Sequence, residues 1–437
     1  MPILLDTSTP EFESEFRQFL ARSRETAQAV DDTVAGIIRR VRRDGDAALI
    51  ELTAQFDGLR LTPDTLAFSA EDIDAAANQV SESRRAALET AQDRIHAFHS
   101  RQLPEDVSWT DDAGAMIGWR WTAVSRAGLY VPGGLAAYPS SVLMNAIPAR
   151  VAGVDDRIMT GPVPNGDANP MVLLAARLSG IATVYRIGGA QAIAALAYGT
   201  ETIRPVDMIA GPGNAYVAAA KRQIFGTVGI DMLAGPSEIL IIADSANDPE
   251  WIAIDLLSQA EHDESARAVL VTDDASLAGK VLAAIDPWLK RLGRRRIADR
   301  SWRSHGAVIQ VRNLDEAVEI SDRIAPEHLS LMVAEPDSLV ERVSNAGAVF
   351  LGPWTPEAVG DYAAGPNHVL PTSANARFSS GLSVLNFMKR TTLTRMTPRA
   401  LARVGPVAVT LAESESLEAH GLSVQARLDR LNAAPRD

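Results

Sequence analysis

The sequence predicts an α/β protein that is built on two parallel sheets, and three observations lead to this prediction. From about residue 123 onward, short runs rich in β-branched residues alternate with helical segments, as in parallel sheets flanked by helices. This alternation falls into two blocks, roughly 130–238 and 239–381. A chain of 437 residues is also too long for one compact core, which favours roughly two to four domains.

The first hundred residues are expected to be mostly helical. Helix starts are indicated near residues 9 and 31, and a capping box at 69–72 opens a further helix. A longer polar-rich helix at about 81–98 ends beside His96 and His99, for which we prefer exposed positions at the helix end.

Strands and helices are expected to alternate through the middle of the chain. The expected strands are 157–159, 183–185, 206–209, 238–243, 268–272, 307–311, 329–333 and 348–351, and the helices between them include 170–178, 191–198, 215–225 and one that starts at Asp248-Pro249.

This reading of the chain gives four expected regions. They are an N-terminal helical segment at 1–25, a discontinuous α/β domain of 26–129 and 239–381, a second α/β domain at 130–238, and a helical C-terminal tail at 382–437. The tail is polar and has no core of its own, so we expect it to pack on another domain or on another subunit.

Composition excludes several classes of function. A net charge of -13 argues against a nucleic-acid or anionic-membrane surface, which needs clustered Lys and Arg. No signal peptide is visible, and no uncharged apolar run is long enough to span a bilayer, so a cytoplasmic protein is expected. The absence of cysteine excludes disulfides, thiolate metal ligands, iron–sulfur clusters and a thiol nucleophile.

The stretch 258–263, Ser-Gln-Ala-Glu-His-Asp, closes the apolar helix that starts at Asp248-Pro249. Gln259 and His262 are three residues apart, so a helix displays both side chains on one face. An amide oxygen and an imidazole nitrogen at a helix end form half of a metal or polar-ligand site. A solvated helix end has the same pattern, and spacing alone favours that alternative.

Glycine-rich loops occupy four consecutive strand–helix junctions, at 130–134, 188–191, 211–214 and 235–238. Ligands of doubly wound sheets bind beyond the carboxyl ends of the strands, where such loops let a ligand approach the backbone. None of them is the dinucleotide fingerprint, because Tyr216 stands where a third glycine is needed. Four loops that also offer polar side chains favour a bound cofactor over ordinary turns; those side chains are Gln191, Asn214 and Ser237.

A second cluster of chemical groups is Ala325-Pro326-Glu327-His328. A carboxylate beside an imidazole offers two groups for acid–base work, although an exposed pair has the same sequence. Asp361, His368, Glu415 and His420 are each unremarkable alone, because scattered residues of these types are usually structural or solvated.

Taken together, these stretches resemble the histidinol dehydrogenase family over nearly the whole chain. The motifs that carry the resemblance occur in family order and include Tyr-Val-Pro-Gly-Gly, Gly-Pro-Gly-Asn, Ile-Asp-Met-Leu-Ala-Gly-Pro-Ser-Glu, Leu-Leu-Ser-Gln-Ala-Glu-His-Asp, Ala-Pro-Glu-His-Leu and Gly-Asp-Tyr-Ala-Ala-Gly-Pro-Asn-His. The fold class that follows is α/β, with two Rossmann-like parallel-sheet domains, a helical N-terminal segment and a small helical C-terminal domain.

The resemblance also implies roles for individual residues. Gln259, His262, Asp361 and His420 correspond to the zinc ligands of the family, and Glu327 and His328 to its catalytic pair. The substrate contacts correspond to Ser237, Glu415, His328 and the four zinc ligands. The NAD contacts correspond to Tyr130, Gln191 and Asn214. In the family, the ligand at His420 comes from the partner subunit, which implies a homodimer with shared sites. The 239–381 domain is then the metal and catalytic one, and 130–238 binds NAD.

The implied reaction is the oxidation of L-histidinol by two NAD to L-histidine through L-histidinaldehyde, with one zinc per subunit. His328 accepts the alcohol proton, and since no thiol is available for a thioester, Glu327 activates the water that adds to the aldehyde. The alternatives are a related zinc and NAD dehydrogenase of another small polar alcohol, and a zinc hydrolase that uses Glu327. The sequence departs from the common family pattern at Met208, Ser373, Ala374, Asn375 and Asn386.

Overall fold

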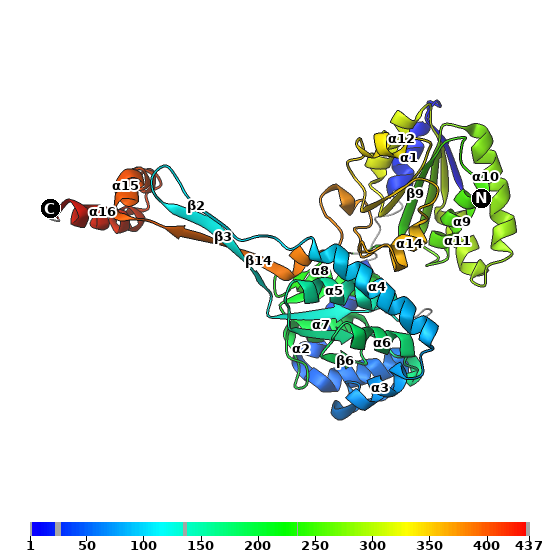
Figure 1. Ribbon diagram of the computed structural model, residues 1–437. Helices are drawn as coiled ribbons and strands as arrows, with labels where there is room; N and C mark the ends of the chain where they lie inside the picture. The colour runs from blue at the N-terminus through cyan, green and yellow to red at the C-terminus, as the bar shows by residue number, and fades with distance from the viewer. Residues whose placement is uncertain (1, 22–27, 134–137, 234, 434–437) are drawn as a thin grey trace. The chain divides into compact units, whose positions relative to one another are not determined.

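The computed structural model describes residues 2–21, 28–133, 138–233 and 235–433. Gly134 of the first predicted glycine-rich loop lies outside the described residues. Compact packing divides the chain into two units, the first formed by 1–102 and 125–387 and the second by 103–124 and 388–437. The first unit holds two parallel sheets, which confirms the predicted α/β class (Figure 1).

A six-stranded parallel sheet forms one half of the first unit. Its order is β1-β11-β10-β9-β12-β13, with β1 at Ile3–Asp6, β9 at Glu238–Ala243, β10 at Arg267–Thr272, β11 at Ala307–Gln310, β12 at His328–Met332 and β13 at Ala348–Leu351. Every residue of β9, β10 and β12 is buried, because helices cover both faces of the sheet.

The two faces of this sheet bury alternate residues of β9. Ile239 and Ile241 pack against α9 (Pro249–Ala260), α10 (Ala275–Leu289) and α11 (Arg295–His305). Leu240 and Ile242 pack on the other side against α1 (Phe12–Ala21), α12 (Leu314–Ile324) and α13 (Pro336–Val340). This period of two is the one that a strand buried between two helical layers requires.

A five-stranded parallel sheet forms the other half. Its order is β6-β5-β4-β7-β8, with β4 at Arg126–Tyr130, β5 at Asp156–Thr160, β6 at Thr183–Tyr185, β7 at Met208–Ala210 and β8 at Gly229–Ile230. One core joins it to α2 (Gln28–Asp57), α7 (Gly189–Tyr198) and α8 (Ala215–Ile224). A second helical group consists of α3 (Ala70–Ala77), α4 (Glu82–Ser100), α5 (Pro139–Val151) and α6 (Pro170–Leu178), of which α5 contacts β4 and β5.

The structure corrects two of the expected domain boundaries. Residues 1–25 were expected to be helical, but β1 adds a parallel strand to the edge of the six-stranded sheet. Residues 26–129 were expected to join 239–381, but α2 packs on α7 and α8, α3 on α6, and α4 on α5. The apolar face of α2, which includes Val34, Ile38 and Val41, is buried with the five-stranded sheet, so burial of that face decides the position of the segment.

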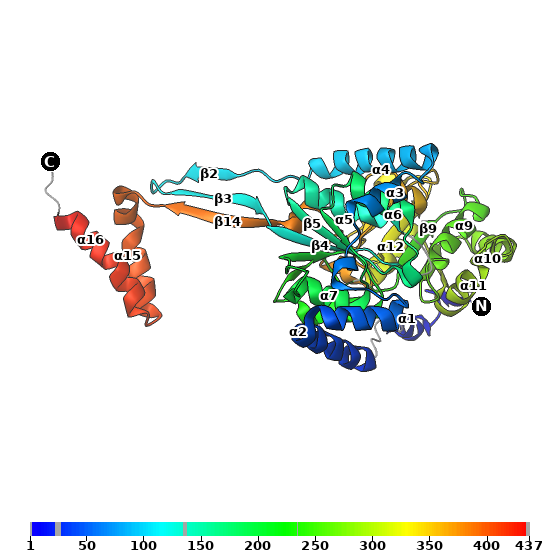
Figure 2. The same cartoon turned by 90° about the horizontal axis from the view of Figure 1, so that it is seen from below.

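The second unit is a three-stranded antiparallel sheet with two helices. Its order is β14-β3-β2, with β2 at Val107–Thr110, β3 at Met116–Ala123 and β14 at Met388–Arg395, followed by α15 (Pro398–Ser414) and α16 (Glu418–Ala433) (Figure 2). The prediction of a purely helical tail is therefore wrong at β14, whose partner β3 lies far away in sequence. The tail is otherwise helical, and its two helices pack on each other.

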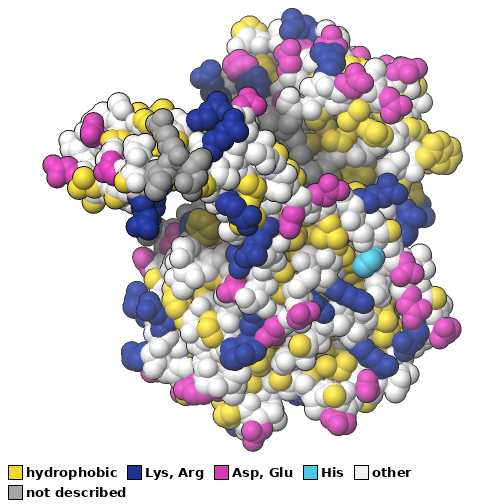
Figure 3. Space-filling view, turned by 60° about the vertical axis from the view of Figure 1, so that its left-hand side comes forward, with side chains coloured by type: hydrophobic (Ala, Val, Ile, Leu, Met, Phe, Trp, Pro, Cys, Tyr) yellow, Lys and Arg dark blue, Asp and Glu magenta, His cyan; other side chains and the backbone are white. Residues whose placement is uncertain are grey.

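The remaining elements are short. They are α14 (Glu357–Tyr362) and 3₁₀ turns at Pro63–Thr65, Pro164–Gly166, Asn375–Arg377 and Val384–Phe387. On the face drawn in Figure 3, acidic and basic side chains are interspersed among scattered hydrophobic ones, so the negative net charge is not gathered into one patch there. Among the described helices, none combines the length and apolar character needed to cross a membrane.

Candidate active site

Glu327 and His328 lie at the amino end of β12, where a tight turn delivers them. Ala325 ends α12 in the left-handed conformation, with φ of 51°, and Pro326 prevents the helix from continuing. Both side chains are buried. The backbone of Glu238, the first residue of β9, holds the pair: its N–H donates to Glu327 Oε2 at 2.9 Å, and its carbonyl lies 3.0 Å from His328 Nδ1.

Burial shifts the pKa values of Glu327 and His328 in opposite directions. It raises the pKa of Glu327 well above its usual value, against the opposing effect of the Glu238 N–H. It lowers the pKa of His328 to about 4, against the opposing effect of Asp361. His328 is therefore uncharged near pH 7. Because a carbonyl oxygen only accepts, Nδ1 carries the ring proton and Nε2, which has no hydrogen-bond partner among the described residues, is free to act as a base.

Glu357 is a third buried group at this site, and the sequence analysis did not identify it. Its Oε1 lies 3.2 Å from His328 Nδ1, and its side chain is 3% exposed. Burial raises its pKa well above the usual value, and the neighbouring Asp361 adds to the rise. Glu357 precedes Asp361 by four residues on α14, so one helix face carries both, and this spacing is the only sequence signal that could have identified Glu357.

Asp361 and His368 complete the group around His328. Asp361 Oδ1 lies 3.9 Å from His328 Nε2 and 3.9 Å from His368 Nδ1. His368, also missed as a site residue, is held by the Asp361 carbonyl at 2.9 Å and by Ser141 Oγ at 3.3 Å. Donor atoms of His328, Glu357 and Asp361 all lie within 4.8 Å of one another, a spacing that suits a metal ion.

Gln259 lies on the last turn of α9, and its surroundings suit a bound ligand. It is 1% exposed, and neither its amide oxygen nor its amide nitrogen has a hydrogen-bond partner within the described part of the chain. Buried polar atoms are rarely left in this state. His262 follows just beyond the helix and is close enough to lower the pKa of both His328 and His368. This set of nitrogen and oxygen donors fits zinc.

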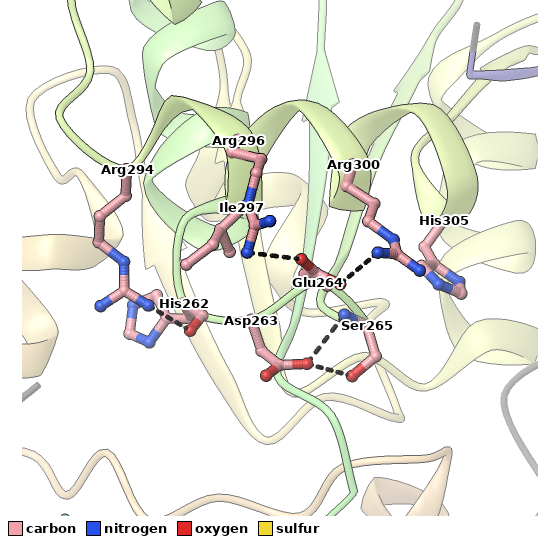
Figure 4. Close-up of a pocket in the computed structure, with 9 residues that line it drawn as sticks. All are labelled: His262, Asp263, Glu264, Ser265, Arg294, Arg296, Ile297, Arg300 and His305. Carbon is pink, nitrogen blue, oxygen red and sulfur yellow. Dashed lines mark hydrogen bonds and ion pairs between the residues drawn. The ribbon is translucent and has the colours of Figure 1, made fainter. Parts of the chain in front are cut away.

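The turn that carries His262 borders a pocket of about 410 Å³, and residues that line this pocket hold the turn in place (Figure 4). Arg294 donates to the His262 carbonyl at 3.1 Å. Asp263 accepts from the Ser265 N–H at 2.9 Å, which closes the turn. Glu264 pairs with Arg300 of α11 at 2.9 Å. These contacts hold the turn that carries His262 against α11 and its N-cap residue Arg294.

Tyr130 and Gln191 converge on Gly189, the first residue of α7. The Gly189 N–H donates to the Tyr130 hydroxyl at 3.2 Å, and the Gln191 amide oxygen lies 2.8 Å from the point that a Cβ on Gly189 would occupy. The N-cap residue is Gly188, which has no side chain to cap the helix, so Tyr130 takes the first N–H and the N-cap takes none of those that follow. A helix N-terminus without a side-chain cap offers N–H groups to an anion such as a phosphate.

Asn214 lies at the end of the neighbouring loop, 211–214, which follows β7. Its side-chain oxygen caps α8 by accepting from the N–H groups of Tyr216 and Val217, and the residue is exposed. The loop touches β4, since a Cβ on Gly211 would lie 1.9 Å from the Tyr130 carbonyl oxygen. Strand order reverses between β4 and β7, and ligands of open α/β sheets bind at such a point.

Ser237 immediately precedes Glu238 and is half-buried. The loop that carries it contacts the turn at 372–375, because Gly235 donates its N–H to Thr372 and Asn375 donates to the Leu233 carbonyl at 3.3 Å. Ser373 and Ala374, two of the departures from the family pattern, have φ of 56° and 62°, the region that favours glycine.

Two further departures, Met208 and Asn386, have local structural roles, and a third, Asn375, makes the contact to Leu233 described above. Met208 is buried at the start of β7, and Asn386 accepts from the Ser383 N–H at 2.8 Å. Glu415 and His420 belong to the second unit, where they lie at the junction of α15 and α16 and are both exposed.

Comparison with known proteins gives consistent matches. Residues 20–428 match the histidinol dehydrogenase family model. The chain is 66% identical to a histidinol dehydrogenase of Cereibacter sphaeroides and 64% identical to one of Ruegeria pomeroyi, in each case over 99% of this chain and 100% of the relative. A crystal structure of histidinol dehydrogenase from Elizabethkingia anophelis is similar at a TM-score of 0.93 and 35% identity, over 99% of both chains.

Proposed function

The chain belongs to the histidinol dehydrogenase family, and from this premise we propose that it oxidises L-histidinol to L-histidine through L-histidinaldehyde, the last two steps of histidine biosynthesis, with zinc and two NAD. The observation that carries the proposal is the match over nearly the full length of relatives with that name, together with a buried Glu327-His328 pair. A biosynthetic role of this kind also supports the cytoplasmic location expected from the sequence.

Zinc would be held by Gln259, His262 and Asp361, with His420 of the partner subunit as the fourth ligand. The unpartnered, buried amide of Gln259 supports this set. When bound, zinc supplies a Lewis-acid centre that can hold the imidazole and amine of the substrate. Ser237, and Glu415 of the partner subunit, would complete the contacts to the substrate.

NAD would lie beyond the carboxyl ends of β4 and β7, against Tyr130, Gln191 and Asn214. The first turn of α7, whose N-cap Gly188 has no capping side chain, supports a phosphate position there. When bound, NAD supplies the acceptor for one hydride in each of the two oxidations.

In the first oxidation, His328 Nε2 accepts the proton of the substrate hydroxyl while the carbinol carbon loses a hydride. Two features of the site support this role: Nδ1 is occupied by the Glu238 carbonyl at 3.0 Å, and the lowered pKa keeps the ring unprotonated before the step. The products of this step are the aldehyde and a proton on His328.

In the second oxidation, water adds to the aldehyde carbon and Glu327 accepts a proton from that water. The Glu238 N–H supports this role, because it donates to Glu327 Oε2 at 2.9 Å and favours the ionised carboxylate that can accept a proton. The hydrate then loses its hydride to give the carboxylic acid. The chain contains no cysteine, so a thioester route is not available.

A homodimer would bring Glu415 and His420 to a neighbouring site. Support for an intermolecular contact comes from the apolar residues that α15 and α16 leave exposed, since large exposed apolar patches mark interaction surfaces. The most exposed are Val407 at 60%, Leu411 at 57% and Leu422 at 67%.

The test is to incubate the purified protein with zinc, histidinol and NAD and to count the NADH formed per histidine. Two NADH per histidine support the proposal. One NADH without histidine points to an alcohol dehydrogenase of the same family, and none points to another reaction, such as zinc-dependent hydrolysis with Glu327.

A further inference from the structure

A buried ion pair joins Lys221 of α8 to Asp231, the residue after β8. Their side chains are 2% and 0% exposed, and Lys221 Nζ donates to Asp231 Oδ1. Lys221 Nζ also donates to the Gly211 carbonyl at 3.0 Å, while Asp231 Oδ2 accepts from the Gly211 N–H at 2.7 Å. The two charges together therefore hold both backbone polar groups of one glycine.

Gly211 needs such partners because β7 ends at Ala210, one residue before it. Its φ is 118°, a conformation that other residues rarely adopt, and its backbone passes too close to the Tyr130 carbonyl for any side chain. From this point the chain runs through Pro212 and Gly213 to Asn214, the N-cap of α8. The position of Gly211 therefore fixes where the loop leaves the sheet.

Asp231 also holds the next segment of chain, because its Oδ1 accepts from the Met232 N–H at 2.6 Å. That segment leads toward Ser237. The carboxylate thus lies between the loop at 211–214 and the start of the loop that carries a predicted substrate contact.

Stability alone does not account for the pair. Burying two charges is unfavourable, and well-packed apolar residues of similar volume often replace such pairs without loss of stability. What an apolar pair lacks is a donor and an acceptor for Gly211. The specific contribution of the ion pair is therefore the geometry of the loop at 211–214.

We propose that Lys221 and Asp231 are positioning residues for the cofactor: they hold Gly211 so that Tyr130 and Asn214 keep the spacing that NAD needs. This inference rests on the proposed NAD site. Neither residue touches the cofactor in this account, and each acts through the backbone of Gly211.

The test compares the parent enzyme with Lys221→Met, Asp231→Leu and the double variant. Each single variant leaves one buried charge unpaired, so the melting temperature falls. The double variant removes one charge of each sign, which leaves the net charge unchanged and restores most of the melting temperature. Its dissociation constant for NAD nevertheless stays about tenfold above that of the parent, since Gly211 has lost both partners. KM for NAD rises likewise, and by a larger factor than KM for histidinol.

A control removes a more exposed ion pair elsewhere in the fold. Arg323 of α12 and Glu13 of α1 pair at 2.9 Å beside the six-stranded sheet. The double variant Arg323→Gln with Glu13→Gln is expected to leave NAD binding unchanged. A second neutral variant, Lys221→Met with Asp231→Asn, keeps an acceptor for the Gly211 N–H but not the donor to its carbonyl. It is expected to weaken NAD binding about threefold, which tests the inference even if the Met and Leu pair does not fold.

The outcomes separate the inference from the proposed function. A folded double variant that binds NAD as the parent does would overturn the inference alone, as would an equal rise in KM for both substrates. A parent enzyme that binds no NAD would overturn the proposed function and the inference with it.

Discussion

The two parallel sheets of the first unit present their functional residues at opposite strand ends. In the five-stranded sheet, Tyr130 ends β4 and the loop at 211–214 follows β7, so the predicted cofactor contacts lie at the carboxyl edge. In the six-stranded sheet, Glu238 begins β9 and His328 begins β12, so the predicted catalytic pair lies at the amino edge. The rule that ligands bind at carboxyl edges accounts for the first arrangement only.

The helices near the two sites also present opposite ends to them. A helix that follows a parallel strand starts at the carboxyl edge and returns to the amino edge, so α7 presents its N-terminus and α9 its C-terminus. The partial positive charge of an N-terminus suits a phosphate, and the partial negative charge of a C-terminus suits a cation. The position of Gln259 and His262 at the end of α9 is therefore consistent with the proposed zinc site.

The largest effect is expected from removing the metal. Stripping the enzyme with a chelator should lower activity about 1,000-fold or more, since a metal centre contributes several kcal/mol to the transition state. NAD binding, which depends on the other sheet, should change little. Activity should return on adding zinc. Full activity in a sample shown by elemental analysis to be metal-free would rule out the metal assignment.

His328→Gln is expected to have the next largest effect. It removes the proposed base at the amino edge and should lower kcat for histidinol about 100-fold to 1,000-fold, the usual contribution of general base catalysis. The dissociation constant for NAD should match that of the parent in a fluorescence titration. A variant that loses NAD affinity and keeps kcat would contradict the assignment of catalysis to the amino edge of one sheet and of NAD binding to the carboxyl edge of the other.

Asp255 is a half-buried residue of α9 that lies close enough to Glu357 to help raise the pKa of that group. Asp255→Asn therefore tests the concentration of carboxyl groups near the amino edge. Burial raises the pKa of Asp255 from 3.8 to about 6, so its ionisation destabilises the native state progressively as the pH rises through that interval. The variant should be more stable than the parent by ~1–3 kcal/mol at pH 7, with the difference shrinking toward pH 4. Denaturant unfolding of the metal-free proteins at several pH values measures this. A gain that is independent of pH would refute the explanation.

Tyr130→Phe should have the smallest effect, and at the opposite edge. It removes the hydroxyl that accepts the Gly189 N–H, so the dissociation constant for NAD should rise about threefold to tenfold. Zinc content and KM for histidinol serve as controls and should not change. If only histidinol binding were affected, Tyr130 would belong to the substrate site instead.

Sequence patterns located most strands of the two parallel sheets, because these strands are short, mostly apolar runs between helical segments. The expected strands 183–185, 238–243 and 348–351 coincide with β6, β9 and β13. The strands β1 to β4, β8 and β14 were missed. Of these, β1 and β14 are short or exposed, and each is defined by a partner more than two hundred residues away. The assignment of 26–129 failed for the same reason, because helices on a surface show which face is apolar but not which sheet that face covers.

Burial of charged and polar groups was harder to predict than the fold. The interpretation of His99 as exposed is wrong: it is fully buried, with Nε2 3.2 Å from the Asn367 amide nitrogen, whereas His96 is exposed as expected. Glu357 has no local signal beyond its spacing from Asp361. Its role follows from the contact with His328 that tertiary packing creates.

The most direct test of the account is the number of hydrides that Glu327→Gln transfers per histidinol. If His328 is the base of the first oxidation and Glu327 that of the second, the variant should complete the alcohol oxidation and stop at the aldehyde. It should then form about one NADH per histidinol in a single turnover, whereas the parent forms two. Equal loss of both oxidations, or two NADH at the parent rate, would contradict the separate role of Glu327.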